Sequence, residues 1–576
     1  MGKAWLGFVG GLAVILSGAL LAWLVQTSGD VTVRDVRFAG DRGTTLSALV
    51  YTPASATAAR PAPGVLLSHG YINTREMQSA FAIELARRGF VVVAMDQPGH
   101  GYSSAIVGAN DFGGPAALRY LKSLPQVDKA NIGLAGHSLG GGPVVGAAAS
   151  DPAGYKAAVL VGSTPAIGAV FGSKATADLR NLALVFGGYD EFAELMWQVP
   201  RGFDAPKSPA MQALFATSGP IEPGRVYGDI GAGTARVLHV PAVTHPWEHF
   251  SAGGVAPTVD WFQRTLDGAA RPLPAGQQVW IWKEVGTLIA FAGMVILMLT
   301  AFDILLGVRW LHRLARTPEP GRARRDGRWW LAFALTAALP AITFFPFMKL
   351  GMLFFPMPVF PQWITNQLLV WALLGAVLTL GTGLVLKAPK SAVRADWPRS
   401  AVIALLSVGA GYVSLHLVDR YLHVDYRFWV LGLKPLDLRH LGFALAYLPL
   451  WTVFFVVSLR GLHGSLAVAG ERRGAHYAAG ILAMCLGFML LLAVQYGALL
   501  ATGRLAIASE PLNTIIAIQF VPLLALVGAI AVFTWRRTGS YLPGALICAL
   551  LVTWYVTAGT ATHWSPQFQL PTPGGG

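Results

Sequence analysis

The order of apolar and polar residues divides the chain into three parts. One apolar run covers residues 4–25 and follows Lys3. From residue 30 to residue 278 the apolar runs become short, and β-rich runs alternate with helical patterns. From about Trp280 onward, long apolar stretches return and continue almost to the last residue. Because a helix needs roughly 20 apolar residues to cross a bilayer, the outer parts predict membrane helices and the middle part a soluble domain.

The first apolar run has the features of an uncleaved membrane anchor. A secretory signal peptide has a shorter apolar core and ends at a small-x-small cleavage site. The residues that follow the run, Gln26 to Gly29, contain no Ala-x-Ala. We therefore favour an N-terminal transmembrane anchor over residues 1–26, with a signal peptide as the alternative.

The middle part, residues 27–279, has the pattern of an α/β domain. Strands that alternate with helices predict a mostly parallel sheet covered by helices on both faces. The first two β-rich runs, 31–38 and 45–51, have no helical pattern between them and predict an antiparallel hairpin. The other expected strands cover 64–68, 90–95, 132–135, 157–161, 182–186 and 235–240, and the expected helices cover 75–88, 111–124, 143–150 and 258–266.

The last part, residues 280–576, carries eight more apolar stretches of membrane-spanning length. We place them at 284–307, 329–350, 365–386, 400–418, 440–459, 476–500, 512–535 and 541–561. The proline-rich, aromatic stretch at 354–363 is interpreted as a loop at the membrane interface or a re-entrant turn. This part therefore predicts an all-α polytopic membrane domain of about eight helices.

Composition agrees with a membrane protein that carries a soluble part. The 576 residues are 54% hydrophobic and only 12% charged, about half the charged share of a typical soluble domain. Two cysteines exclude a disulfide-stapled scaffold. Cysteine alone also cannot supply the four ligands of a structural zinc site. We expect no metal ion and no cofactor.

The net charge of +14 does not indicate nucleic-acid binding. Residues 27–279 hold 19 basic and 19 acidic residues, so the whole excess lies in the two apolar parts. A nucleic-acid binder would carry its charge on a folded polar surface. We therefore expect the lipid bilayer as a partner and no nucleic acid, while the sequence identifies no protein partner.

The distribution of lysine and arginine between the loops predicts the orientation in the membrane. Lys3 and alternate loops hold seventeen basic residues, whereas the opposite short loops hold six. The basic side is cytoplasmic by this rule, which places the N-terminus in the cytoplasm and residues 27–279 outside it. We expect an integral protein of the plasma or inner membrane. The seventeen are Lys3, Arg309, Arg313, Arg316, Arg322, Arg324, Arg325, Arg328, Lys387, Lys390, Arg394, Arg399, Arg460, Arg472, Arg473, Arg536 and Arg537.

A short motif in the middle part has the residue pattern of a catalytic serine turn. Residues 136–140 read Gly-His-Ser-Leu-Gly, a G-x-S-x-G pattern that follows a predicted strand and precedes a helix of small residues. In this setting, glycines permit a strained turn that lifts the serine hydroxyl clear of the sheet. The helix N-terminus behind the serine favours negative charge as it develops. We therefore interpret Ser138 as a candidate nucleophile rather than as part of an ordinary glycine-rich helix start.

With this motif, residues 31–266 resemble the α/β-hydrolase superfamily, which includes serine esterases, lipases and dienelactone hydrolases. Two further motifs support the resemblance. Ser68-His69-Gly70-Tyr71 follows one predicted strand, and Asp-Gln-Pro-Gly-His-Gly-Tyr-Ser follows the next, at residues 96–103. The resemblance implies an α/β-hydrolase fold for less than half of the chain. The membrane domain shows no such resemblance.

The resemblance also implies roles for the residues that match the family's motifs. Ser138 would be the nucleophile, and the backbone N–H groups of Tyr71 and Leu139 would form the oxyanion hole. The family order is serine, acid, histidine. His69 precedes Ser138, so we interpret it as a residue that orders its loop rather than as the base.

The acid and the base should follow later strands. Asp190 comes after a strand and a glycine turn, as in the family's G-x-x-D turn, and its neighbour Glu191 is the alternative acid. Two histidines follow the last strand. His245 comes four residues after Pro241, as expected for a loop at the strand's end, whereas His249 begins a His-Phe pair that is common in the family. We favour His245 and keep His249 as the alternative base.

These residues predict a membrane-bound serine hydrolase that forms an acyl-enzyme and cleaves an ester of a small-molecule or lipid-like acyl group. Thioesters and amides are alternative substrates for the same chemistry. Two other functions stay open: an acyltransferase that uses the same triad, and a transporter or membrane-assembly protein whose hydrolase-like domain only binds. The last part has no pair of acidic helices and no clear inverted repeat, so it gives no sign of a transport cycle.

Overall fold

The structure is a computed structural model that describes residues 2–386 and 395–568. It contains two compact units, each built from separate stretches of the chain. The helical unit comprises Met1–Leu20, Gly286–Gln495 and Leu512–Ala558, and the sheet unit comprises Leu21–Val285, Tyr496–Pro511 and Gly559–Gly576. Lys387, Lys390 and Arg394, which contribute to the predicted membrane orientation, lie outside the described residues.

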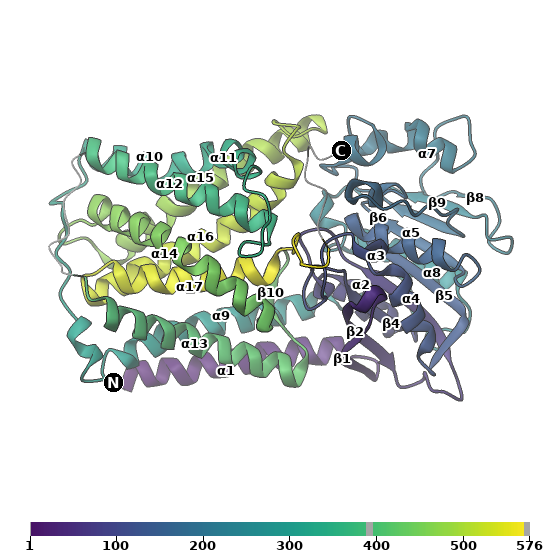
Figure 1. The fold of residues 1–576 in the computed structure, drawn as a ribbon, viewed down its shortest axis with the longest axis horizontal. Helices are drawn as coiled ribbons and strands as arrows, with labels where there is room; N and C mark the ends of the chain where they lie inside the picture. The colour runs from purple at the N-terminus through teal and green to yellow at the C-terminus, as the bar shows by residue number, and fades with distance from the viewer. Residues whose placement is uncertain (1, 387–394, 569–576) are drawn as a thin grey trace. The chain divides into compact units, whose positions relative to one another are not determined.

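The sheet unit is built around a nine-stranded, mostly parallel sheet (Figure 1). Its strands lie in the order β1-β2-β4-β3-β5-β6-β7-β9-β8. The strand bounds are β1 (Val31–Ala39), β2 (Thr45–Pro53), β3 (Ala62–Ser68), β4 (Val91–Asp96), β5 (Val127–His137), β6 (Ala157–Val161), β7 (Leu182–Val185), β8 (Val226–Tyr227) and β9 (Arg236–His239). The antiparallel pairing of β1 with β2 confirms the predicted hairpin. The six strands β4, β3, β5, β6, β7 and β9 run parallel, whereas the edge strand β8 pairs antiparallel with β9.

The central strands are mainly apolar because helices cover both faces of a parallel sheet. Every residue of β4, which reads Val-Val-Val-Ala-Met-Asp, is buried. Two groups of helices supply this cover. Helix α2 (Ser79–Ala86) packs against α8 (Ala252–Thr265), while α4 (Gly114–Ser123) packs against α5 (Gly141–Ser150).

Two local predictions in this unit differ from the structure, and one segment contains elements that were not predicted. The helix expected at 75–88 begins with the 3-10 turn η2 (Arg75–Gln78) before α2. The helix expected at 111–124 is divided into α3 (Ala109–Phe112) and α4 by Gly113, whose φ is 75°. The segment between β7 and β9 contains helices α6 (Ala193–Trp197) and α7 (Pro209–Leu214), the 3-10 turn η5 (Gly202–Lys207) and edge strand β8, which the sequence pattern did not reveal.

The rest of the chain consists mainly of long apolar helices. Among the described residues, eight helices are long and apolar enough to cross a membrane, and a bent pair makes a ninth if it is one span. The eight are α1 (Gly2–Gln26), α9 (Ile281–Leu305), α12 (Trp363–Val385), α13 (Trp397–Leu422), α14 (Leu438–Leu466), α15 (Arg473–Thr502), α16 (Pro511–Thr538) and α17 (Leu542–Gly559). These helices agree with the predicted spans and with a membrane protein.

The bent pair corresponds to the span predicted at 329–350. Helices α10 (Gly327–Ile342) and α11 (Phe344–Gly351) meet at an angle of 45° instead of forming one helix. Pro340, in the last turn of α10, lacks the N–H that would continue the helical hydrogen bonds. The hydroxyl of Thr343 donates to the carbonyl of Leu339 at 2.7 Å, beside the break. The predicted orientation depends on whether this pair counts as one span.

The helical unit is not wholly α-helical, and it contains a charged pair between two of its helices. Strands β10 (Tyr426–Phe428) and β11 (Leu431–Leu433) form an antiparallel hairpin between α13 and α14, where we expected a loop. Asp303 on α9 accepts from the guanidinium of Arg537 on α16, with Nη2 2.8 Å from Oδ2. Pairing of this kind lowers the cost of placing charges among apolar helices.

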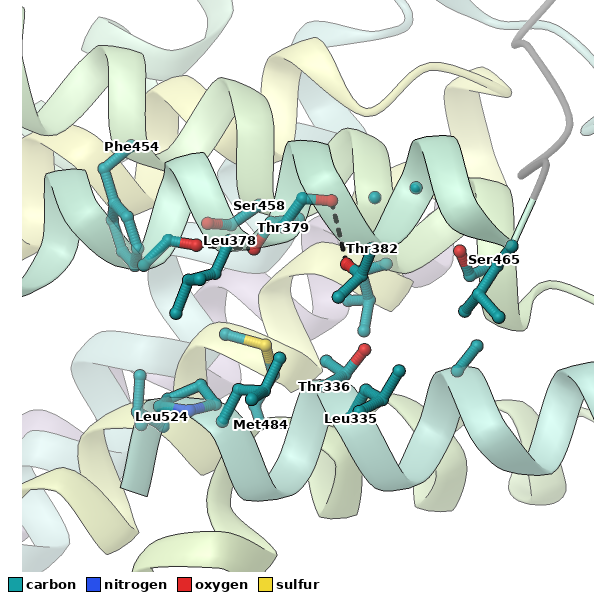
Figure 2. A pocket seen from close by; sticks show the side chains of 18 of the residues that line it. Leu335, Thr336, Leu378, Thr379, Thr382, Phe454, Ser458, Ser465, Met484 and Leu524 are labelled. Carbon is teal, nitrogen blue, oxygen red and sulfur yellow. Dashed lines mark hydrogen bonds between the residues drawn. The ribbon is translucent and has the colours of Figure 1, made fainter. Parts of the chain in front are cut away.

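A cavity of about 80 Å³ lies between α10, α12 and α14 in the helical unit (Figure 2). Two of its hydroxyl groups bond to helix backbones: Thr379 donates to the carbonyl of Gly375, and Thr382 to that of Thr379, both at 2.9 Å. The other labelled side chains in Figure 2 include Leu335, Leu378 and Phe454. The cavity wall is therefore mainly apolar and suits a hydrocarbon group better than an ion.

Candidate active site

Ser138 lies at the turn between β5 and α5. Its φ of 54° falls in the left-handed region, where a non-glycine residue is strained. Two glycines allow neighbouring main chain to approach this turn. A methyl group on Gly136 would lie 2.0 Å from the carbonyl oxygen of Gly140, and one on Gly140 would lie 2.4 Å from that of Ser68. The turn therefore has the tight strand-to-helix shape that the G-x-S-x-G pattern predicts.

Asp190 and His245 form a buried pair on two neighbouring loops. Asp190 follows β7, and His245 begins the 3-10 turn η6 (His245–Trp247) after β9. Nδ1 of His245 lies 2.8 Å from Oδ2 of Asp190. The backbone N–H of His245 donates to Oε2 of Glu191 at 2.7 Å. Asp190 thus bonds to the imidazole of His245, while Glu191 bonds to the main chain of His245.

His249, the alternative base, is placed beside His137. Its Nδ1 lies 3.5 Å from Nε2 of His137, and the two ring centroids are 4.5 Å apart. Asp190 instead bonds to His245 and to the backbone N–H of Phe192. The geometry therefore pairs the candidate acid with His245.

Ser138 lies near this pair without being joined to it. In the part of the chain that the structure describes, no hydrogen bond links the Ser138 hydroxyl to His245. The residue before Ser138, His137, does contact His245. The centroids of the two rings are 4.7 Å apart, and Nε2 of His137 donates to the His245 carbonyl at 3.2 Å. Catalytic hydrogen bonds are often long before substrate binds, so this arrangement is compatible with proton transfer.

The other side of Ser138 faces the loop after β3. A methyl group on Gly70 would lie 3.1 Å from Cβ of Ser138, so this loop approaches the serine closely. The next residue, Tyr71, accepts at its carbonyl from Nε2 of His100 at 2.6 Å. Among the described residues, the Tyr71 N–H donates no main-chain hydrogen bond. Leu139, the other expected oxyanion donor, is buried and lies in the 3-10 turn η3 (Ser138–Gly140), which leads into α5.

A third carboxyl group, Glu248, lies beside the Asp190–His245 pair. It is fully buried, its Oε2 is 3.6 Å from Nδ1 of His245, and its Oε1 accepts from the Gly187 N–H at 2.5 Å. Burial, and then the charge of Asp190, raise the pKa of Glu248 well above its usual range, so the group stays neutral. Sequence reasoning missed Glu248 because a glutamate between Trp247 and His249 looks like a surface charge.

The same surroundings shift the pKa values of three other groups. Burial lowers the pKa of His245, but the charge and hydrogen bond of Asp190 outweigh this effect and raise it above its ordinary value. Burial and the charge of Asp190 raise the pKa of Glu191 to about 7. Burial and the charges of the neighbouring His249 and His245 hold the pKa of His137 well below its ordinary value. His137 is therefore neutral, and His245 is the basic imidazole of the cluster.

Three of these side chains have the spacing of a metal site. His137, His245 and Glu248 place ligand atoms within 4.8 Å of one another, and histidine with carboxylate ligands suits zinc. However, Nδ1 of His245 already bonds to Asp190. A metal on that nitrogen would compete with the bond, so the arrangement suits proton transfer better than a resident ion.

Two residues from late in the chain also reach this site within the sheet unit. The hydroxyl of Tyr496 donates to Oε1 of Glu191 at 2.8 Å. Nε2 of His563 lies 2.7 Å from the hydroxyl of Tyr71. Sequence reasoning assigned both residues to the membrane part, and no motif marks either one.

Comparisons with known proteins agree with this architecture. A family model for the alpha/beta hydrolase fold matches residues 63–202. Similar solved structures include a dienelactone hydrolase from Anabaena variabilis, 19% identical, which covers 41% of this chain and 99% of its own, with a TM-score of 0.29. An esterase from the archaeon Pyrobaculum calidifontis is 17% identical and covers 44% of this chain and 91% of its own, with a TM-score of 0.29. No curated protein matched the chain.

The matched residues run from β3 through α6 and include Ser138 and Asp190. Around them the structure has the mostly parallel sheet, the flanking helices and the strained serine turn described above. The N-terminal part of the chain therefore has the α/β-hydrolase fold, and a region of long apolar helices follows it.

Proposed function

We propose that the chain is a membrane-bound serine hydrolase that cleaves carboxylic esters through an acyl-enzyme on Ser138. One observation carries the proposal: a strained serine after β5 and a buried Asp190–His245 pair after β7 and β9. These strands are parallel, so their carboxyl ends lie at the same edge of the sheet. A nucleophile, a base and an acid at one edge is the arrangement that acyl transfer requires.

His245 acts as the general base. Its Nδ1–H donates to Asp190, which leaves Nε2 to take the proton from the Ser138 hydroxyl as its oxygen attacks the acyl carbon. Asp190 holds the imidazole in this tautomer and stabilises the imidazolium that forms. The imidazolium then gives its proton to the leaving alcohol, and a water molecule, activated in the same way, releases the acid.

The backbone N–H groups of Tyr71 and Leu139 stabilise the oxyanion of the tetrahedral intermediate. Two observations support this role for the Tyr71 N–H. The loop that carries Tyr71 approaches Ser138, and within the described residues this N–H donates no main-chain hydrogen bond. Leu139 lies in the turn directly before α5, where helix N–H groups favour negative charge. Loss of one such donor typically lowers the turnover number by about 10²–10³.

The surroundings suggest which ester to test first. Long apolar helices precede and follow the hydrolase fold in the chain and are consistent with a membrane location. A domain tethered to a bilayer meets lipid-like acyl esters at high local concentration. We therefore propose lipid-like esters as the substrate class, ahead of thioesters and amides.

Activity-based labelling of the full-length protein tests this proposal. The purified wild-type protein should react with a fluorophosphonate probe and hydrolyse p-nitrophenyl esters, and Ser138→Ala should abolish both. Ser150→Ala, at the exposed end of α5, is the matched control and should leave both unchanged. Labelling that persists in Ser138→Ala would assign the nucleophile elsewhere and overturn the proposal.

A further inference from the structure

Two late segments of the chain belong to the sheet unit. Tyr496–Pro511 comprises the last turns of α15 and the loop that leads to the start of α16, and Gly559–Gly576 begins at the last residue of α17. The two segments therefore flank the helix pair α16–α17 in the chain. Both contain residues that bond to the candidate active site, one on each side of it.

The segment after α17 is docked through its main chain. The Thr562 N–H donates to the Gly99 carbonyl at 2.8 Å, and the Val107 N–H donates to the Thr562 carbonyl at 3.1 Å. Ala561 is buried in the hydrophobic core of the sheet unit. A methyl group on Gly99 would lie 2.7 Å from the Thr562 carbonyl oxygen, so the two strands of chain touch closely. These contacts fix the position of the next residue, His563.

His563 holds the side chain of Tyr71. Its Nδ1 donates to the Ala561 carbonyl at 3.1 Å, so the neutral ring offers Nε2 as an acceptor to the Tyr71 hydroxyl, 2.7 Å away. Burial lowers the pKa of His563 to about 4, which keeps the ring neutral. His100 holds the carbonyl of Tyr71 at 2.6 Å. Tyr71, whose N–H is the proposed oxyanion donor, is thus fixed at both ends.

Tyr496 acts on the opposite side of the site. Its hydroxyl donates to one oxygen of Glu191 at 2.8 Å, and the other oxygen accepts the His245 N–H at 2.7 Å. The carboxylate of Glu191 therefore connects Tyr496 to the main chain of the proposed base. The same segment packs along the Arg201 side chain, because a methyl group on Gly503 would lie 2.6 Å from its Cδ.

We propose that His563 and Tyr496 are positioning residues of the active site, so that the segments flanking α16–α17 complete the oxyanion side and the base side of a hydrolase encoded mainly by residues 31–266. The inference rests on the proposed function. Neither residue is placed to touch reacting atoms; His563 acts through Tyr71, and Tyr496 acts through Glu191 on His245. The geometry makes these two segments of the C-terminal half a working part of the hydrolase.

A double-mutant cycle in the full-length protein tests His563. Tyr71→Phe and His563→Leu each remove the same hydrogen bond, so each should lower the rate of fluorophosphonate labelling and kcat about tenfold. The double variant should be no slower than either single variant, because only one bond is lost. His563→Gln, whose side-chain oxygen can accept from Tyr71, should restore most of the rate.

The pH profile of ester hydrolysis tests Tyr496. The Tyr496 hydrogen bond favours the charged form of Glu191, and that charge raises the pKa of His245. Tyr496→Phe should therefore move the acid limb of kcat/KM to lower pH. In a Glu191→Gln background the same substitution should cause no further shift. A role confined to packing would leave the midpoint of the limb in place.

Thr562→Val is the matched control, because the buried Thr562 hydroxyl has no hydrogen-bond partner among the described residues. It should leave labelling and pH profile unchanged. Additive losses in Tyr71→Phe and His563→Leu, or an unmoved acid limb in Tyr496→Phe, would overturn the inference while Ser138-dependent activity remains. Absence of that activity in the wild type would instead overturn the proposed function. If His563→Leu fails to fold, Tyr71→Phe tests the same bond by removing one oxygen.

Discussion

The carboxyl group of Glu248 lies 3.6 Å from Nδ1 of His245, the nitrogen that already bonds to Asp190. Two charged carboxylates on one nitrogen would repel each other, and burial keeps Glu248 protonated. Glutamine matches a protonated glutamate in shape and can still accept from the Gly187 N–H. We therefore expect Glu248→Gln to keep kcat within about tenfold of wild type. Glu248→Ala should lower the thermal midpoint, because it leaves a buried donor without an acceptor.

The two histidines after β9 should differ sharply in their effect on turnover. His245→Asn removes the proposed base and should lower kcat by about 10²–10⁴. His249→Asn removes a side chain that contacts His137, whereas Asp190 bonds to His245, so it should change kcat by less than about tenfold. Steady-state ester hydrolysis measures both. Equal losses in the two variants would contradict the assignment of His245.

The pH dependence of kcat/KM should report His245. The base must be neutral to accept a proton, and Asp190 raises its pKa above the ordinary value of 6.5 despite burial. Activity should therefore rise with pH through a midpoint above 6.5. Glu191→Gln removes a negative charge that favours the imidazolium, so the midpoint should move to lower pH. The exposed Glu194→Gln is the control, and a midpoint that stays constant in Glu191→Gln would exclude this coupling.

Gly162, directly after β6, should tolerate no side chain. Its φ is 53°, and a methyl group there would lie 1.8 Å from Oε2 of Glu248 and 2.9 Å from Nδ1 of His245. Backbone strain and overpacking each cost about 1–3 kcal/mol. Gly162→Ala should therefore lower the thermal midpoint and the labelling rate together.

Gly172 provides the matched control for this substitution. Its φ is 79°, but nothing lies within 4 Å of an added methyl group. Gly172→Ala should cost only the backbone strain, about 1–2 kcal/mol, and leave labelling intact. If Gly162→Ala had the same thermal midpoint and the same labelling rate as Gly172→Ala, the close packing of Gly162 against the site would not matter for function.

Single cysteines can test the proposed orientation in the membrane. Both natural cysteines, Cys485 and Cys548, are buried, so background labelling should be low. Lys129→Cys, exposed on the hydrolase fold, should react with a membrane-impermeant maleimide in intact cells. Arg324→Cys, exposed in a basic loop, should react only after permeabilisation. The reverse pattern would place the hydrolase fold in the cytoplasm.

Local patterns were sufficient to predict the sheet and the serine turn. Strands such as β4 are apolar at nearly every position because they are buried on both faces. The G-x-S-x-G spacing reflects close contacts that only glycine permits. The contact between Asp190 and His245 could also be predicted from the sequence. Both follow parallel strands, whose carboxyl ends meet at one edge.

The remaining features depend on contacts that the chain order does not reveal. Tyr496 and Glu191 are 305 residues apart, and neither lies in a motif that would connect them. Glu248 is polar in sequence, and only the fold shows that it is buried. The break between α10 and α11 was missed because hydropathy continues through a change of helix direction.

The hydrogen bond between Tyr71 and His563 joins residues separated by 492 positions in the chain. During synthesis, Ser138, Asp190 and His245 leave the ribosome long before His563 does. On the proposed arrangement, a nascent chain would already hold its nucleophile, acid and base but would lack the last support of its oxyanion hole. Full catalytic power would then appear only after α16 and α17 have been made and His563 has bonded to Tyr71, which would protect membrane lipids from a half-made enzyme.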